Sequence, residues 1–179
     1  MKLSTYNTND IEEIKQLFTK TFTDSEGDSE GKIIGDLAYD LMMTTDSHDL
    51  NQIVATENEK IVGSIIFSRL TFEEDKVNAF VMGPVAVHTD HQRKGIGQKL
   101  INYGINALKH ADVELVFTYG DPNYYSKVCF KVISEELIKA PFKLSYPEGW
   151  MCQSLTSDEI ELIAGDSHCV DALNKSKYW

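Results

Sequence analysis

The most informative segment of the chain reads Gly83-Pro84-Val85-Ala86-Val87-His88-Thr89-Asp90-His91-Gln92-Arg93-Lys94-Gly95-Ile96-Gly97. An apolar strand passes through a short polar turn into a glycine-rich helix start. The first amides of a helix have no intrahelical acceptor and lie at the positive end of the helix dipole. Glycines there allow a ligand to approach the backbone closely. The segment therefore predicts an anion-binding site, most naturally for phosphate.

The local charge supports a polyanionic ligand. Between residues 89 and 99, Arg93, Lys94 and Lys99 minus Asp90 give a sum of +2, although the whole chain carries −11. The overall acidity argues against nucleic acid and anionic membrane surfaces as partners, because both favour a basic face.

Two common phosphate motifs do not fit this segment. A P-loop requires Gly-Lys-Ser/Thr, which is absent. A dinucleotide fingerprint starting at Gly95 requires a third glycine or alanine, and Leu100 occupies that position. A glycine turn that merely starts a helix remains an alternative.

The pattern Gln-x-x-Gly-x-Gly, formed by Gln92, Gly95 and Gly97, resembles the acetyl-CoA signature of the GNAT acyltransferase superfamily. Downstream, residues 124–130 (Tyr-Tyr-Ser-Lys-Val-Cys-Phe) are similar to that family's Tyr-x-x-x-Gly-Phe segment, with Tyr125 in the tyrosine position. Three further segments resemble the YhbS-like bacterial subgroup of acetyltransferases: 83–87, 120–125 and 140–142. The resemblance spans nearly the whole chain and is strongest over residues 77–130.

The order of predicted elements agrees with that family. Periodicity predicts helices near 9–22, 32–44, 95–110 and 123–128, and strands near 2–7, 52–56, 61–70, 77–87, 113–118, 130–137 and 150–155. Residues 159–163 are a candidate edge strand. This order indicates an α/β (α+β) mixed sheet in a single domain, residues 1–179. The resemblance implies a mostly antiparallel sheet, splayed between the fourth and fifth strands, with helices on both faces.

The resemblance also implies a cofactor site for acetyl-CoA. The backbone of the strand before the turn would pair with the pantetheine arm, since Gly83-Pro84 should interrupt that strand. The amides of the turn would hold the pyrophosphate. The implied cofactor-binding residues are Val85, Ala86, Val87, Gln92, Arg93, Lys94, Gly95, Ile96, Gly97 and Gln98.

Tyr125 is the candidate catalytic residue, as the acid that protonates the leaving thiolate. A packed aromatic whose hydroxyl finds another partner is the alternative. No general base stands out among the many carboxylates. His88 and His91 are interpreted as solvent-facing turn residues, and Cys129 as a nucleophile is disfavoured, because direct transfer needs none.

One departure from the family pattern falls at Cys129, where the family has glycine. A left-handed cap at this position would cost a cysteine about 1–2 kcal/mol. Either the cap differs or the strain is tolerated.

The acidic segment from Asp24 to Glu30 is interpreted as a loop, and the family resemblance implies that it borders the acceptor site. Its four carboxylates would attract a cationic amine, although a simple solvated loop is the alternative.

These observations predict an N-acetyltransferase that transfers an acetyl group from acetyl-CoA to a primary amine of a small molecule or peptide in a ternary complex. A non-catalytic acyl-CoA-binding regulatory domain is the alternative. The histidines and three cysteines show no metal-ligand or disulfide spacing, and no signal peptide or apolar run of about 18 residues occurs. We therefore expect a cytoplasmic protein without a metal, as a monomer or a homodimer.

Overall fold

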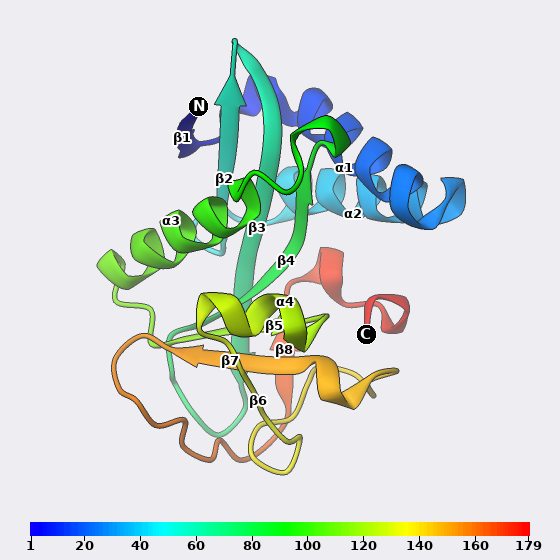
Figure 1. Cartoon of the computed structure of the whole chain (residues 1–179). Coiled ribbons are helices and arrows are strands. Elements are labelled where there is room, and N and C mark those ends of the chain that lie inside the picture. The colour runs from blue at the N-terminus through cyan, green and yellow to red at the C-terminus, as the bar shows by residue number, and fades with distance from the viewer.

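A mixed sheet of eight strands forms the centre of the computed structural model, which describes residues 1–179 (Figure 1). The strands are β1 (Lys2–Thr5), β2 (Leu50–Glu57), β3 (Lys60–Phe72), β4 (Ala79–Val87), β5 (Leu115–Tyr119), β6 (Lys131–Val132), β7 (Trp150–Ser154) and β8 (Ser167–Cys169). Their order is β1-β2-β3-β4-β5-β7-β6, and β8 pairs with β3. Only β4 and β5 pair in parallel. The predicted mixed, mostly antiparallel sheet is confirmed.

Helices cover both faces of this sheet (Figure 1). The helices are α1 (Ile11–Glu26), α2 (Asp28–Thr44), α3 (Ile96–His110) and the short α4 (Pro122–Tyr125). Helices α1 and α2 contribute to one apolar cluster and α3 to the other, because alternate strand residues point to opposite faces. No helix combines the length and the apolar character needed to cross a membrane.

The sheet opens where the sequence predicts. Strands β4 and β5 pair from Ala79 and Leu115 to Met82 and Thr118, and no further. The Thr118 hydroxyl donates a 3.1 Å hydrogen bond to the Met82 carbonyl at this last pair. Gly83-Pro84 follows, and the β3–β4 register shifts at the same place. Because proline cannot donate a ladder hydrogen bond, a bulge forms, and the rest of β4 leaves β5.

The first helix starts differently from the predicted start near residue 9. Asn7 instead caps a 3₁₀ turn over Thr8–Asp10 in a reciprocal capping box with Asp10, and α1 follows directly.

The acidic segment is helical, so its interpretation as a loop is wrong. Helix α1 continues to Glu26 and α2 begins at Asp28, with only Gly27 between them at φ 97°. Asp28 and Glu30 lie in the first turn of α2, where acidic side chains suit the positive end of the helix dipole.

The C-terminal third departs most from the sequence-based prediction. The predicted strand 130–137 is only Lys131–Val132, because the chain turns at Ser134, whose carbonyl accepts from the amides of Leu137 and Ile138. Residues 159–163 form no strand, apart from a single bridge between Ile163 and Ile138. The added strand is β8, which pairs with the end of β3.

Candidate active site

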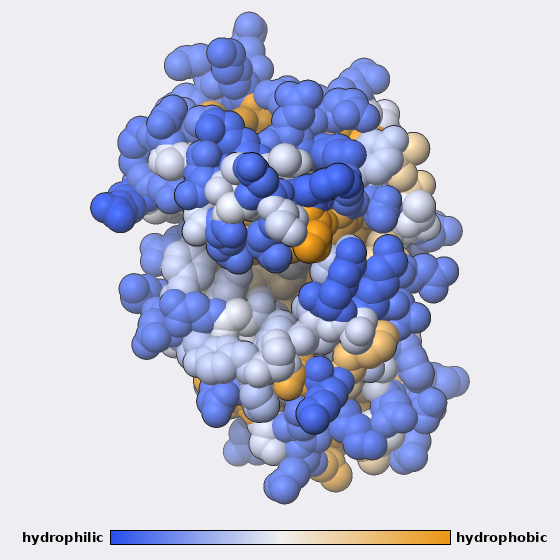
Figure 2. Space-filling model, turned by 90° about the vertical axis from the view of Figure 1, so that its right-hand side faces the viewer, coloured by the Kyte–Doolittle hydropathy of each residue, from blue (hydrophilic) through white to orange (hydrophobic).

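A cleft of about 640 Å³ lies where β4 leaves β5. Its lining comes from α1, β4, the turn before α3 with the start of α3, and α4: Thr21, Phe22, Ser25, Glu26, Val85, Val87, Gln92, Arg93, Gly95, Ile96, Gly97, Gln98, Tyr124 and Tyr125. Figure 2, which faces the side of the molecule at the right of Figure 1, shows a surface hollowed across its middle. Nine of the eleven site residues predicted from the sequence thus surround one cavity.

The turn before α3 presents unpaired amides to this cleft. Gly95 is the N-cap of α3 at φ 76° and provides no side-chain cap. The first helical hydrogen bond runs from the Lys99 amide to the Gly95 carbonyl, so the three preceding amides have no backbone acceptor. Arg93 is also left-handed, at φ 60°. Alternating left-handed residues before a helix form a concave set of N–H groups that binds anions.

The two remaining predicted residues do not line the cleft. Ala86 is buried and belongs to the apolar cluster on the α1–α2 face. The Lys94 ammonium donates to the Asp90 carbonyl at 3.0 Å and so stabilises the turn. Gln92 lines the cleft, but its side-chain amide donates to the Val87 carbonyl at 3.0 Å, which fixes the turn against the end of β4.

Neither histidine of the turn lines the cleft, but both side chains are half-buried and not solvent-facing as predicted. The Nδ1 atom of His88 accepts from the Asp90 amide at 3.3 Å, and His91 lies 3.1 Å from the carboxylate of Glu57.

The end of α1 is tied to the same turn. The Thr89 hydroxyl donates a 2.6 Å hydrogen bond to the Asp24 carboxylate, which Lys20 also contacts at 3.1 Å. The hydrogen bond from Thr89 and then that from Lys20 lower the pKa of Asp24. Glu26, two residues further along α1, lines the cleft itself. The four acidic residues of this segment are therefore not equivalent.

Tyr125 ends α4 and is half-buried at the cleft. Its ring packs edge-on against Tyr124, with 5.1 Å between centroids, and against Phe130 at 6.0 Å. Burial, with a smaller effect of Tyr124, raises the pKa of Tyr125 to about 12, and a contact with the Thr118 hydroxyl acts in the opposite direction. The phenol therefore stays protonated at neutral pH.

Cys129 adopts the left-handed conformation that glycine would favour, at φ 70°. The family-type cap is thus kept and the strain is tolerated. The Phe130 amide donates back to the Tyr125 carbonyl at 3.2 Å, so this cap holds the end of the Tyr125 segment.

Tyr124 also lines the cleft, although the sequence analysis assigned it no role. A Cβ built on Gly97 would overlap the Tyr124 hydroxyl oxygen and would lie 3.6 Å from its Cζ. The signal in the sequence was the adjacent pair Tyr124-Tyr125, of which only Tyr125 was assigned a role from the resemblance.

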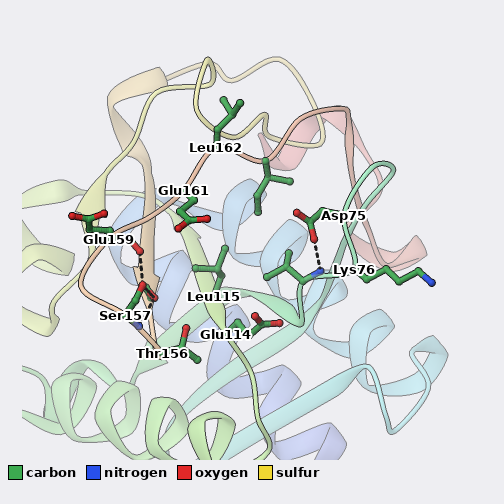
Figure 3. Close-up of a pocket in the computed structure, with 12 residues that line it drawn as sticks. Asp75, Lys76, Glu114, Leu115, Thr156, Ser157, Glu159, Glu161 and Leu162 are labelled. Atoms are coloured by element: carbon green, nitrogen blue, oxygen red, sulfur yellow. Dashed lines mark hydrogen bonds between the residues drawn. The ribbon is translucent and has the colours of Figure 1, made fainter.

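A second cavity, of about 460 Å³, lies at the opposite end of β5, beside Glu114 and Leu115 (Figure 3). Half of its polar lining residues are acidic, and hydrogen bonds from Val77 to Asp75 and from Ser157 to Glu159 hold its walls. None of the predicted site residues lines it. No group of three or more His, Cys, Asp or Glu side chains in the structure is arranged to hold a metal ion.

Comparison with known proteins identifies relatives that are all described as acetyltransferases. The family described as "Acetyltransferase (GNAT) domain" matches residues 2–133. The uncharacterized N-acetyltransferase YjhQ of Escherichia coli is 29% identical over 168 residues, which cover 91% of this chain and 88% of YjhQ. YhbS of the same species is 28% identical over 69% of each chain.

Solved structures share the fold. YhbS from Escherichia coli in complex with CoA superimposes with a TM-score of 0.80 at 22% identity, over 97% of this chain and 92% of YhbS. A Brucella melitensis GNAT acetyltransferase in complex with acetyl-CoA gives 0.75 at 22% identity, over 96% and 97% of the two chains.

Proposed function

Because the chain belongs to the GNAT family of acetyltransferases, we propose that it binds acetyl-CoA in the cleft and transfers the acetyl group to a primary amine of a small molecule or peptide. The observation that carries this proposal is the uncapped start of α3, where three free amides follow the left-handed residues Arg93 and Gly95. The CoA and acetyl-CoA complexes of the two fold relatives support it.

In the proposed complex, the amides of Ile96, Gly97 and Gln98 bind the diphosphate of the cofactor. The guanidinium of Arg93 adds positive charge beside them. The pantetheine arm extends along the edge of β4 beyond Met82, since this edge no longer pairs with β5. Val85 and Val87 flank that edge, and the arm's amides pair there as an added strand would.

The reaction is a direct transfer. The neutral amine attacks the thioester carbonyl carbon, and a backbone N–H beside the β4 bulge stabilises the developing oxyanion. The C–S bond then breaks, the amine loses one proton and the CoA thiolate gains one. Tyr125 donates a hydrogen bond to the departing sulfur. The pKa of the Tyr125 phenol, about 12, exceeds that of an ordinary thiol near 8.5. If the phenol gives its proton to the sulfur, the resulting phenolate is therefore protonated again at neutral pH.

The amine approaches from the α1 side of the cleft in this proposal. Glu26 lines that side, and further carboxylates lie on the neighbouring turns of α1 and α2. Their field attracts a cationic amine, so the preferred acceptors are amines that are protonated in solution and lose a proton before attack. Carboxylates near the cleft are also the available bases.

Two measurements on the purified chain test the proposal. Calorimetry should show binding of CoA and acetyl-CoA, and a thiol-release assay should show turnover of acetyl-CoA with at least one member of a broad panel of amines. Absence of CoA binding by folded protein would overturn the proposal. Binding without thiol release for any amine would instead favour the non-catalytic acyl-CoA-binding domain.

We propose that the protein is located in the cytoplasm. All three cysteines are free thiols, which suits a reducing compartment. The assay buffer should therefore contain a reductant that does not interfere with thiol detection.

A further inference from the structure

Two tyrosines line the cleft, and only one has a role in the proposed reaction. Tyr124 and Tyr125 are consecutive residues of α4 whose rings meet edge-on at an interplanar angle of 81°. Tyr125 packs against Phe130, toward the interior. Tyr124 instead reaches across the cleft to the first turn of α3, where its hydroxyl lies against Gly97.

This contact gives the glycine at position 97 a role in placing the Tyr124 hydroxyl. Gly97 is helical and has an ordinary φ, so backbone conformation does not require glycine there. An added Cβ would overlap the Tyr124 hydroxyl oxygen, whereas its next neighbours, Tyr124 Cζ at 3.6 Å and Val87 Cγ2 at 3.7 Å, are ordinary contacts. The missing side chain therefore makes room for one oxygen atom.

That oxygen lies beside the free amides of α3 and is not used within the protein. Burial alone raises the pKa of Tyr124, and no hydrogen bond contributes to the shift. The phenol is thus a protonated, partly desolvated donor at the place where the backbone offers three further donors. This hydroxyl is available to donate a hydrogen bond to an anion bound at the same place.

We propose that Tyr124 is a cofactor-binding residue whose hydroxyl donates a hydrogen bond to the diphosphate held at the start of α3. Tyr124 then completes the anion site that Arg93, Gly95 and the α3 amides begin, and it links α4 to α3 across the bound cofactor. This inference rests on the proposed function. It assigns different tasks to the two tyrosines: Tyr124 binds the diphosphate, and Tyr125 acts at the sulfur.

Matched variants separate these tasks. Tyr124→Phe should raise the Kd for CoA about tenfold, since a hydrogen bond to a charged group is lost, and should leave kcat at saturating acetyl-CoA close to wild type. Tyr125→Phe should instead lower kcat and leave the Kd for CoA unchanged. With S-acetylpantetheine, which lacks the diphosphate, Tyr124→Phe and wild type should have equal kcat/KM. A Tyr124→Phe variant that binds CoA as tightly as wild type would overturn the inference alone.

A double-mutant cycle tests the contact itself. Gly97→Ala should displace the Tyr124 hydroxyl and weaken CoA binding several-fold. In the Tyr124→Phe background the same alanine meets Cζ of residue 124 and Cγ2 of Val87 only at ordinary contact distances, so it should add little further loss. Fully additive losses would contradict the proposed geometry. Circular dichroism and Tm of each variant establish that it is folded, and failure of folded wild type to bind CoA would overturn the proposed function together with this inference.

Discussion

Single side chains of α4 and its cap carry the most direct chemical predictions. Tyr125 is half-buried, and the pKa of its phenol is raised to about 12 by burial. Below pH 10 the phenol is protonated in both the folded and the unfolded chain. Between pH 10 and about 12 only the unfolded chain ionises at this group, so the contribution of Tyr125 to stability falls as pH rises through that range.

Tyr125→Phe should lower kcat about a hundredfold and leave the Kd for CoA unchanged, because the hydroxyl is needed at the departing sulfur and not for binding. Below pH 10 the pH–rate profiles of wild type and variant should have the same shape, because the Tyr125 phenol stays protonated there. Steady-state kinetics combined with calorimetry make this measurement. Full activity of the variant would remove Tyr125 from the mechanism.

Cys129→Gly should increase the free energy of unfolding by about 1 kcal/mol, since glycine adopts the left-handed cap at φ 70° without the Cβ penalty. Denaturant unfolding measures the change. Cys129→Ala is the matched control, because it removes the thiol but retains Cβ, and it should show no such gain. A Cys129→Gly variant less stable than wild type would show that the thiol has a packing role.

At the scale of elements, the start of α3 is the proposed diphosphate site. Gly97→Glu places a carboxylate among the free amides and beside Tyr124, so CoA binding should be lost while the fold is kept. Asn106→Glu adds the same charge to the exposed face of α3, more than two turns away, and should leave the Kd for CoA within about twofold of wild type. Calorimetry compares the two, and equal binding by both variants would contradict an anion site at Gly97.

The junction of α1 and α2 makes a separate prediction about the acceptor. Glu26→Gln should raise the KM for a cationic amine a few-fold without changing the Kd for CoA, since Glu26 lines the cleft. Asp28→Asn is the control, because this neighbouring carboxylate is exposed and lies outside the lining. Asp24 is a poor choice for this test, because its hydrogen bond from Thr89 would be lost as well. Identical KM values for both variants would exclude a role of Glu26 in acceptor binding.

At the scale of the whole molecule, the C-terminal segment completes the core on the α1–α2 face. Trp179 is 5% exposed, stacks on Tyr119 and meets Trp150 edge-on, and its indole donates to the Leu173 carbonyl. These contacts join the last residues of the chain to β5 and β7. The segment therefore supports the two strands on the far side of the splay.

Trp179→Ala should reduce the free energy of unfolding by about 3 kcal/mol, because it leaves a large cavity between the sheet and the segment. Lys177→Ala, two residues away on the surface, should change it by less than about 0.5 kcal/mol. Chemical denaturation of both variants measures the difference. A loss below about 1 kcal/mol for Trp179→Ala would show that the segment is not part of the cooperative core.

The sequence by itself determined the features that depend on local chemistry. Helical and strand periods located most elements, Gly83-Pro84 predicted the interruption of β4, and the glycines with the basic pair predicted the anion turn. Each of these follows from a backbone preference or from a charge close in sequence. The resemblance to the GNAT family supplied the list of site residues, and nine of those eleven line the cleft.

Only the tertiary structure decided the features that depend on contacts between distant residues. The Thr89–Asp24 hydrogen bond and the pairing of β8 with β3 have no local signature, because each joins residues 65 or more positions apart. The contact of Tyr124 with Gly97 joins two helices separately placed by the sheet. A sequence pattern records what a residue prefers, whereas the packing of the sheet and its helices sets which residues meet.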